Sequence, residues 1–387
     1  MTTTAYRPQT PTFGNRDAEG PIWLRIDASI ILLTIALSCI GVIVVYSATR
    51  GVLDPETDIA NTSFLKKQLV FIGAGLGLAG ITAAVDYRKA RLVVPLIYGA
   101  VLVSLIGLFF FGTDLNTFAT SWYSLGFITI QPSEFAKIAL ILALASWFGS
   151  LESRDGLEFV NVLVGVAMSA AFAALVLLQP DFGTVMVYAA IVAGIVLVAG
   201  VAVRHVLAVL GFVGFAIFAM IRSGYLLDTQ LARFTSFVSD DPSNEARWNV
   251  FQSEIAIGSG GLRGQGLFQG TQNINSLVPE KESDFIFSVL GEEFGFFGGA
   301  TLLVLFGLLL LRIWRVAHLA EDAFGRLICV GVFSMFLFQA FQSVGMNMGI
   351  MPVTGIPLPL ISYGGSSMVT SLIALGLVEN VHAHRLR

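Results

Sequence analysis

Long stretches without any charged side chain are the feature that most restricts how this chain can fold. The segment IILLTIALSCIGVIVVYSA, residues 30–48, holds no Asp, Glu, Lys or Arg, and about 20 mainly apolar residues suffice to cross the hydrocarbon core of a bilayer. Charged residues make up only 12% of the 387-residue chain, whereas a soluble domain carries about 25%. The sequence therefore predicts an all-α polytopic membrane protein.

The apolar runs predict about ten membrane-spanning helices. They cover residues 27–48, 67–85, 91–111, 133–149, 157–178, 184–202, 204–222, 284–312, 323–350 and 362–380. One long loop, residues 223–283, separates spans seven and eight, and its Phe, Trp, Ile and Leu residues predict ordered packing with interfacial helices around WNVFQSEIAI. Residues 27–380 are thus expected to form a single membrane domain. A disordered tail of residues 1–26 precedes it, and a short tail of residues 381–387 follows.

The distribution of Lys and Arg over the loops predicts the sidedness of the protein. An even number of spans places both termini on one side. The segments on that side hold Arg7, Arg16, Arg25, Arg88, Lys89, Arg91, Arg154, Arg204, Arg312, Arg315, Arg326, Arg385 and Arg387. The short loops on the other side hold only Arg50, Lys66 and Lys67. Because short cytoplasmic loops carry an excess of Lys and Arg, both termini are predicted to be cytoplasmic and the loop 223–283 extracytoplasmic.

Charge and cysteine content argue against several other classes of protein. The formal net charge of −4 is small and does not favour a nucleic-acid partner. Cys39 and Cys329 both lie in apolar segments, where cysteine behaves as a small hydrophobic residue, so no disulfide framework is indicated. The four histidines lie near the ends of spans without the spacing of metal ligands.

Ionisable residues inside or beside the spans are the first candidates for function. Glu134 and Lys137, in QPSEFAK, share one helix face at i and i+3. They form either a structural ion pair or a substrate contact, because such groups usually face the interior of a bundle or a wet cavity. Asp181, in QPDFGT, could cap the following helix through its carboxylate or contact a substrate.

Glycine and proline clusters mark two irregular segments. GSGGLRGQGLFQG lacks the lysine ending of a phosphate-binding loop, so its glycines are expected to allow tight turns and close backbone approach. In MPVTGIPLPLISYGGSS, Pro352, Pro357 and Pro359 predict an irregular backbone, which membranes tolerate only when it is buried or lines a cavity. The SYGGSS end could bind an anion at a helix start, or could serve capping and close packing.

Asp284 is an ionisable residue in an apolar setting, because Phe285 follows it at the start of the predicted span 284–312. At 100° per residue, Glu293 points away from its face, which carries small residues: Ser288, Gly291, Gly295, Gly298 and Gly299. A face of small residues permits close contact or borders a cavity. Asp284 is therefore predicted to point into the bundle at its outer rim, as a general base or, alternatively, as a helix cap.

Five blocks of the sequence carry a resemblance to a known family. They are QPSEFAK, QPDFGT, FQSEIAIGSGGLRGQG, PEKESDFIFSVLGEEFGFFG and TGIPLPLISYGGSS. With these blocks in family order, the chain resembles the SEDS proteins (shape, elongation, division and sporulation), the membrane glycosyltransferases that polymerise peptidoglycan. Within the family, GQGLFQGTQ is more similar to the RodA elongation branch than to the FtsW division branch.

The resemblance implies an inverting reaction on lipid II, a disaccharide-pentapeptide carried by undecaprenyl diphosphate. The 4-hydroxyl of the acceptor's GlcNAc attacks C1 of the donor's MurNAc, and the lipid diphosphate leaves. The family's catalytic aspartate matches Asp284, which would act as the general base. His-Thr usually precedes that aspartate, whereas Glu282 and Ser283 stand here, so the loop contacts around the base are expected to differ.

Substrate-binding residues are expected in the same blocks and the loops beside them. They are Trp122, which matches a functionally sensitive tryptophan of the family, and Glu134, Lys137, Asp181, Arg233, Gln252, Ser253, Arg263, Glu280 and Ser362. Lys137, Arg233, Arg263 or a divalent metal, Mg²⁺ or Mn²⁺, could stabilise the leaving diphosphate. No other cofactor is expected, and the sequence identifies no ligands for the metal.

Partners and location follow from the same resemblance. A class B penicillin-binding protein that crosslinks the new strand, other membrane proteins of the elongation complex and membrane lipids are expected, without nucleic acid. The protein is expected in the bacterial cytoplasmic membrane, with its active site on the extracytoplasmic side. A lipid II flippase and a scaffold for wall synthesis are the alternatives. The polar blocks gather on the outer side, which favours surface chemistry over alternating access.

Overall fold

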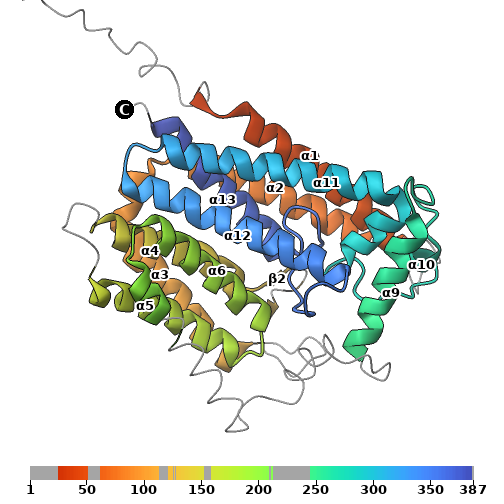
Figure 1. The fold of residues 1–387 in the computed structure, drawn as a ribbon, viewed down its shortest axis with the longest axis horizontal. Coiled ribbons are helices and arrows are strands. Elements are labelled where there is room, and N and C mark those ends of the chain that lie inside the picture. Colours follow the sequence, from red (N-terminus) through yellow and green to blue (C-terminus); the bar gives the residue numbers. More distant parts are fainter. Residues whose placement is uncertain are drawn as a thin grey trace, which may run out of the picture.

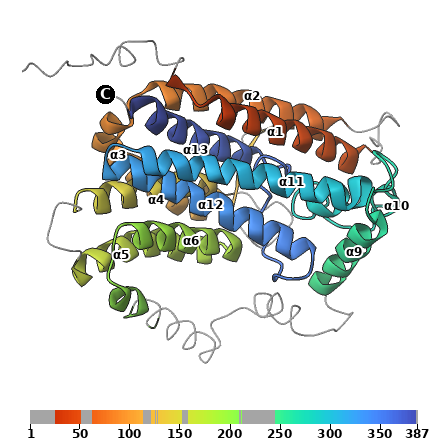
Figure 2. The ribbon, with the colours of Figure 1, turned by 45° about the horizontal axis from the view of Figure 1, so that its top comes forward.

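The computed structural model describes residues 25–50, 62–112, 121–151 except 125 and 127, 158–208, 211 and 245–385. Within these residues the chain forms a bundle of long helices that run side by side (Figures 1 and 2). They are α1 Ala28–Thr49, α2 Ser63–Ala84, α3 Tyr87–Phe111, α4 Pro132–Gly149, α5 Phe159–Leu177, α6 Phe182–Val198, α11 Ile286–Leu319, α12 Ala323–Asn347 and α13 Gly365–His384. The smaller elements are β1 Tyr123–Ser124, β2 Thr129–Ile130, α9 Glu245–Gly260 and α10 Thr271–Ile274.

Nine of the predicted spans coincide with long helices of the described chain, and the predicted class is confirmed. Six of these helices, α1, α2, α3, α5, α11 and α12, are long and apolar enough to cross a membrane. The seventh predicted span, residues 204–222, lies mostly outside the described residues. The predicted tail 1–26 lies outside them as well, apart from its last two residues.

Aspartates determine where four of the helices begin. Asp27, Asp86, Asp181 and Asp322 stand at the N-caps of α1, α3, α6 and α12, and each accepts a hydrogen bond from a backbone N–H in the first turn. These N–H groups have no partner within their own helix, which is why a short acidic side chain is favoured there. Pro132 takes the first position of α4, where a missing N–H costs no helical hydrogen bond.

Helix α12 lies at the centre of the bundle and organises the packing around it. In the apolar 18-residue stretch of α12, 72% is buried inside the protein. The corresponding share for α3 is only 17%, so most of the α3 surface is not covered by protein. Helices α2 and α13 pair closely through small residues. A Cβ added to Gly376 would stand 2.6 Å from the backbone oxygen of Ala79, so only glycine permits this approach.

Helix α11 is broken at Gly295, where φ is 63° and ψ is −161°. The predicted span 284–312 is therefore wrong in its details, because the helix begins at Ile286, runs to Leu319 and is discontinuous. The predicted face of small residues assumes 100° of rotation per residue, so it does not extend past the break at Gly295. The sequence shows the glycine but not the break, because the break depends on a distant segment.

The glycine-rich segment that follows α9 supplies the backbone partners that the break in α11 removes. The N–H groups of Gln265 and Gly266 donate to the carbonyl oxygens of Glu292 and Glu293, at 2.9 and 3.1 Å. In return, Phe296 N–H donates to the oxygen of residue 261 at 2.9 Å, and the next N–H donates to that of residue 262 at 3.2 Å. Membranes tolerate irregular backbone only when such groups are satisfied within the protein.

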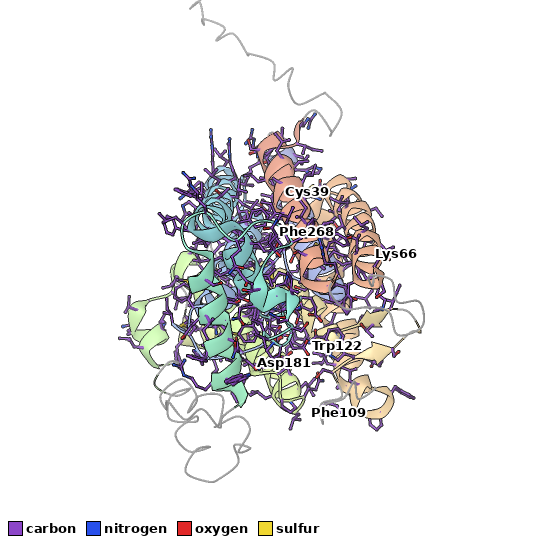
Figure 3. All side chains as sticks on the ribbon, turned by 90° about the vertical axis from the view of Figure 1, so that its right-hand side faces the viewer. Cys39, Lys66, Phe109, Trp122, Asp181 and Phe268 are labelled. Atoms are coloured by element: carbon purple, nitrogen blue, oxygen red, sulfur yellow. The ribbon has the colours of Figure 1, made fainter. Side chains whose placement is uncertain are left out.

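Close backbone contact between α9 and α11 requires glycine. A Cβ added to Gly260 would stand 2.0 Å from Gly291 O, and one added to Gly264 would stand 2.1 Å from Glu293 O. The end of the same segment reaches α1, where Arg50 lies 4.5 Å above the ring of Phe268. Figure 3 shows Phe268 over α1 at this end of the bundle. The expected role of the glycines in close backbone approach therefore agrees with the geometry.

We expect Gly260→Ala to lower the free energy of unfolding by on the order of 1–3 kcal/mol, the usual cost of forcing extra volume into a packed interface. The thermal midpoint of the protein purified in detergent measures this change. Gly258→Ala is the matched control on the same helix, because a Cβ at that position meets nothing within 4 Å. Its midpoint should stay the same or rise slightly, since alanine favours helix. Equal midpoints for the two variants would contradict this packing.

Candidate active site

A polar cavity of about 400 Å³ lies near the end of the bundle where α9 and α10 sit. Six of the residues predicted for the site line it: Trp122, Glu134, Lys137, Asp181, Glu280 and Asp284. They come from four separate parts of the chain, which the fold brings together. Figure 3 shows Trp122 and Asp181 near one another, viewed from this end. Other polar residues of the lining were not among the predicted site residues: Ser121, Gln131, Gln179, Thr184, Ser283, Thr354, Tyr363 and Ser367.

Asp284 lies in a tight turn two residues before α11, rather than in the helix itself. Its N–H donates to the carbonyl oxygen of Glu280 at 3.0 Å, and Glu280 has a positive φ of 46°. The carboxylate is half-buried and stands beside Gly355, in the irregular segment before α13. A Cβ on Gly355 would lie 3.4 Å from Asp284 Oδ2, so the glycine leaves room next to the carboxylate.

The segment before α13 holds the turn through two successive carbonyl oxygens. Tyr363 N–H donates to Glu282 O at 2.8 Å, and Ser362 Oγ donates to Ser283 O at 2.6 Å. Ser362 Oγ also accepts from Leu358 N–H at 2.8 Å. Ser362 is not among the residues that line the cavity. Its contacts position the backbone of the turn, and its substrate-binding role stays a prediction.

Asn347, the last residue of α12, binds both the carbonyl oxygen of Asp284 and the start of α11. Its Nδ2 donates to Asp284 O at 2.9 Å and to Ser343 O at 2.8 Å, and its Oδ1 accepts from Ser288 N–H at 3.0 Å. Asn347 is fully buried. Asn347 thereby caps the N-terminus of α11 from another helix. The N-cap residue Phe285 cannot do this, since its phenyl ring accepts no hydrogen bond from a backbone N–H.

Lys137 presents a cation to the cavity beside its partner Glu134. Lys137 Nζ lies 2.7 Å from Glu134 Oε1, and their side chains are only 2% and 5% exposed. Among the described residues, Lys137 Nζ donates only to Glu134, whereas an ammonium carries three donors. The geometry shows the ion pair that the sequence suggests, and the pair also faces the cavity.

Asp181 caps α6 and lines the cavity, so the two interpretations of this residue are compatible. Its Oδ1 accepts from Thr184 N–H at 3.0 Å, and its Oδ2 accepts from Thr184 Oγ1 at 2.7 Å. Gln131 Nε2 donates to the same Oδ2 at 3.2 Å. Trp122 is placed by the β1–β2 hairpin that follows it, which Tyr123 fastens to α3 by donating to Ser104 O at 2.8 Å.

Other predicted substrate-binding residues do not line this cavity. Ser253 is buried in α9 and donates through Oγ to Asn347 O at 2.8 Å, and its neighbour Gln252 is buried too. Arg263 is exposed on the glycine-rich segment, beyond the cavity lining. Arg233 lies outside the described residues. The roles assigned to these residues stay predictions.

The two acids that follow Asp284 in the sequence are structural. Glu292 is fully buried, and its carboxylate accepts from the N–H groups of Gln272 and Asn273, at 2.7 and 3.1 Å, at the start of α10. Glu293 is buried as well, and its Oε1 accepts from Ser47 Oγ and Asn273 Nδ2. These bonds tie α10, α11 and α1 together, which fits the prediction that Glu293 points away from Asp284.

Burial shifts the ionisation of the loop beside the cavity. It raises the pKa of Glu282 above its ordinary value, and the charge of Glu280 adds to that rise. Burial also raises the pKa of Tyr363 and lowers that of Lys281. Among the residues that the structure describes, no three His, Cys, Asp or Glu side chains gather where they could hold a metal ion. The divalent cation therefore stays a prediction.

We expect Asn347→Leu to free the turn that carries Asp284. The change removes one of two acceptors for Ser288 N–H, which keeps its 3.1 Å bond to Phe285 O, and removes a donor for Asp284 O, at a cost of about 1–3 kcal/mol for a partly buried carbonyl that loses its donor. Hydrogen exchange followed by mass spectrometry should show faster exchange over residues 282–288. Asn347→Asp keeps the acceptor and should preserve more protection at Ser288. Unchanged exchange in Asn347→Leu would contradict this account, and Asn275→Leu, at an exposed side chain, is the control.

Comparisons with known proteins agree with this fold. The chain matches the family model of the FtsW, RodA and SpoVE proteins, described as cell cycle proteins, over residues 27–387. It is 34% identical over 363 residues to "Probable peptidoglycan glycosyltransferase FtsW" of Trichlorobacter lovleyi, covering 92% of this chain and 93% of that protein. It is 33% identical over 433 residues to the peptidoglycan glycosyltransferase RodA of Treponema pallidum, covering 93% and 98%.

A solved structure has the same architecture. It comes from work on the structural coordination of polymerization and crosslinking by a peptidoglycan synthase complex, and its matching chain gives a TM-score of 0.77 at 31% identity. The match covers 94% of this chain and 99% of that chain. The identities to the FtsW and RodA relatives are nearly equal, so they do not separate the two branches. The chain is an integral membrane protein and belongs to the FtsW, RodA and SpoVE family of cell cycle proteins, the SEDS family.

Proposed function

We propose that this protein is a peptidoglycan glycosyltransferase that polymerises lipid II, with Asp284 as its general base. One observation carries the proposal: a single polar cavity holds both Asp284 and the buried Glu134–Lys137 pair. A carboxylate that takes a proton and a cation that meets a leaving diphosphate are the two groups that this transfer needs. The names of the FtsW and RodA relatives support the same reaction class.

The proposed step is a displacement at a sugar carbon. The acceptor's GlcNAc 4-hydroxyl forms a bond to C1 of the donor's MurNAc from the face opposite the leaving group, so the configuration inverts. The C1–O bond to undecaprenyl diphosphate breaks, and its electron pair leaves with the diphosphate. The hydroxyl proton passes to the Asp284 carboxylate. Lys137 Nζ, with donors to spare, offsets the charge that develops on the diphosphate.

The proposed sidedness is supported by the opposite ends of α11. Asp284 precedes the first residue of this helix, whereas Arg312 and Arg315 lie in its last turns. A helix of this length covers roughly 50 Å, more than the hydrocarbon thickness of a bilayer. Because basic residues favour the cytoplasmic side, the arginines support a cytoplasmic position for that end of α11. The proposal then has the cavity on the extracytoplasmic side and both termini in the cytoplasm.

A role in elongation with a class B penicillin-binding protein is part of this proposal. The likeness to a chain of a peptidoglycan synthase complex supports a transpeptidase partner. The block GQGLFQGTQ, residues 264–272, supports the RodA branch. In the structure this block pairs with the break in α11, so its sequence has a direct structural consequence.

We expect Asp284→Asn to reduce polymerisation of labelled lipid II by at least about 10²-fold, the usual contribution of a positioned base. The assay uses the full chain, purified with its transpeptidase partner, and scores long glycan strands on a gel. Glu282→Gln is the matched control, because it removes a carboxylate from the same turn outside the cavity lining. Its activity should stay within about threefold of the wild type, well short of the loss expected at the base.

Folding must be separated from chemistry in this assay. Both variants should keep the thermal midpoint of the wild type, since an amide has the size and shape of the carboxylate that it replaces. Long strands made by Asp284→Asn at the wild-type rate would disprove the role of the base. Transport of lipid II across vesicle membranes without any polymer, in the wild type with its partner present, would favour a flippase instead.

A further inference from the structure

Two cavities meet at the end of the bundle opposite Asp284. The first, which we call the basic recess, measures about 290 Å³ and lies between the start of α1 and the ends of α11 and α13. Figures 1 and 2 show the start of α1 beside the C-terminus at this end, with α9 and α10 at the other. The recess is roughly 40 Å from Asp284 along α11, so it is separate from the polar cavity.

The basic recess gathers positive charge. Arg312, Arg315 and Arg385 line it together with His382, and Asp27 supplies the one carboxylate among the described lining residues. Arg312 Nη1 lies 3.8 Å from Asp27 Oδ2, and Arg385 Nη1 lies 3.1 Å from His382 Nδ1. Arg315 is exposed and makes no hydrogen bond or ion pair with another described residue. Three guanidinium groups thus face one carboxylate, which leaves a net attraction for an anion.

The Asp27 carboxylate is already engaged by the protein. Burial raises its pKa, but hydrogen bonds from Ser29 and the charges of Arg312 and His382 outweigh this and hold the pKa below its ordinary value. Asp27 therefore stays ionised at neutral pH and satisfies the first turn of α1. It neutralises Arg312 more than the other two arginines, because Arg312 is the one within ion-pair distance.

The second cavity, which we call the apolar groove, begins where the recess ends. It measures about 190 Å³ and runs between α1, α2 and α13, and Ile26 lines both cavities. From Ile26 to Ile35 the groove follows α1 for about 13 Å. Small residues, including Gly80, line it together with Ile31 and Ile35, which are 40% and 45% exposed. Its apolar lining and exposed rim suit a lipid chain.

Glu379 stands at the junction of the two cavities. It lines the groove and is only 6% exposed, and its Oε2 accepts from Asp27 N–H at 2.9 Å. Its Oε1 is buried and finds no donor among the described residues. A buried acceptor without a partner costs free energy. A ligand that carries a hydroxyl or ammonium donor beside its anionic group would complete this site.

We propose that the basic recess and the apolar groove together bind one anionic phospholipid of the phosphatidylglycerol class. Its phosphate lies against Arg315 and Arg385, a headgroup hydroxyl donates to Glu379 Oε1, and one acyl chain occupies the groove. Basic pockets between membrane helices select anionic headgroups in this way. A free phosphate would use the recess alone and would leave the groove and Glu379 unexplained. The lipid is distinct from the substrate proposed above, because the two sites lie at opposite ends of α11.

Binding of single lipids to the full-length, delipidated protein in detergent tests this proposal by native mass spectrometry. Phosphatidylglycerol should bind more tightly than phosphatidylcholine with the same acyl chains. The double variant Arg315→Gln/Arg385→Gln should weaken phosphatidylglycerol binding by about 25-fold, or about fivefold for each arginine. Arg204→Gln removes an exposed arginine outside both cavities and should have no effect.

The groove is tested separately from the charge. A Cβ at Gly80 meets nothing within 4 Å, so Gly80→Leu should fill the groove and weaken lipid binding without unfolding the protein. Gly77→Leu is the matched control, because position 77 is equally open but lies outside the groove. Thermal midpoints without added lipid verify that every variant is folded.

Inorganic phosphate distinguishes a lipid site from an ion site. Millimolar phosphate should displace phosphatidylglycerol poorly, because it lacks the acyl chain. Equal affinity for phosphatidylglycerol and phosphatidylcholine, or no loss in the double variant, would overturn the proposal. Full displacement by phosphate, with no effect of Gly80→Leu, would overturn it as well and would leave a plain anion site.

Discussion

The break in α11 is tolerated only because its backbone groups find partners elsewhere in the protein. At membrane depth, every backbone N–H and C=O must have such a partner. Gly295 leaves the regular helix, and the glycine-rich segment after α9 pairs with the groups that this exposes. The pairing is possible only because Gly260 and Gly264 lack a Cβ that would clash with α11. The glycine-rich segment is therefore built into the bundle, where it fixes the first part of α11, the helix that Asp284 precedes.

The turn before α11 is fixed from two sides. The segment before α13 holds the carbonyls of Glu282 and Ser283, and Asn347 holds that of Asp284. None of these bonds uses the Asp284 side chain. The backbone can thus be rigid while the carboxylate faces the cavity beside Gly355, as a group that must meet a substrate requires. The neighbouring acids Glu292 and Glu293 instead form hydrogen bonds to α10 and α1, so they are not candidates for contact with a substrate.

Much of the fold could be predicted from the sequence, because membrane spans are local. Their apolar runs, aspartate caps and Pro132 are each contained within one helix. Six of the predicted site residues do line one cavity, and the family blocks contain five of them; Trp122 lies just before the first block. The break at Gly295 and the role of Asn347 could not be predicted, since both depend on partners far away in the chain. Gln131 and Thr354 were missed because neutral polar residues near helix ends occur for many reasons.

The two ends of the bundle carry different chemistry. One end presents a carboxylate and a partnered lysine to a polar cavity, and the other presents arginines beside an apolar groove. Helix α11 joins them, with its break close to the first end. This arrangement fits the proposed action on a lipid-linked substrate at one end of the bundle and the proposed binding of a phospholipid at the other.

A structure of the protein bound to an unreactive lipid II analogue tests the central claim most directly. The account predicts a sugar hydroxyl within about 3.2 Å of the Asp284 carboxylate, as a general base requires. It also predicts the diphosphate against Lys137 Nζ in the same cavity. A bound analogue whose sugars contact neither residue, with the polar cavity left open, would contradict the assignment.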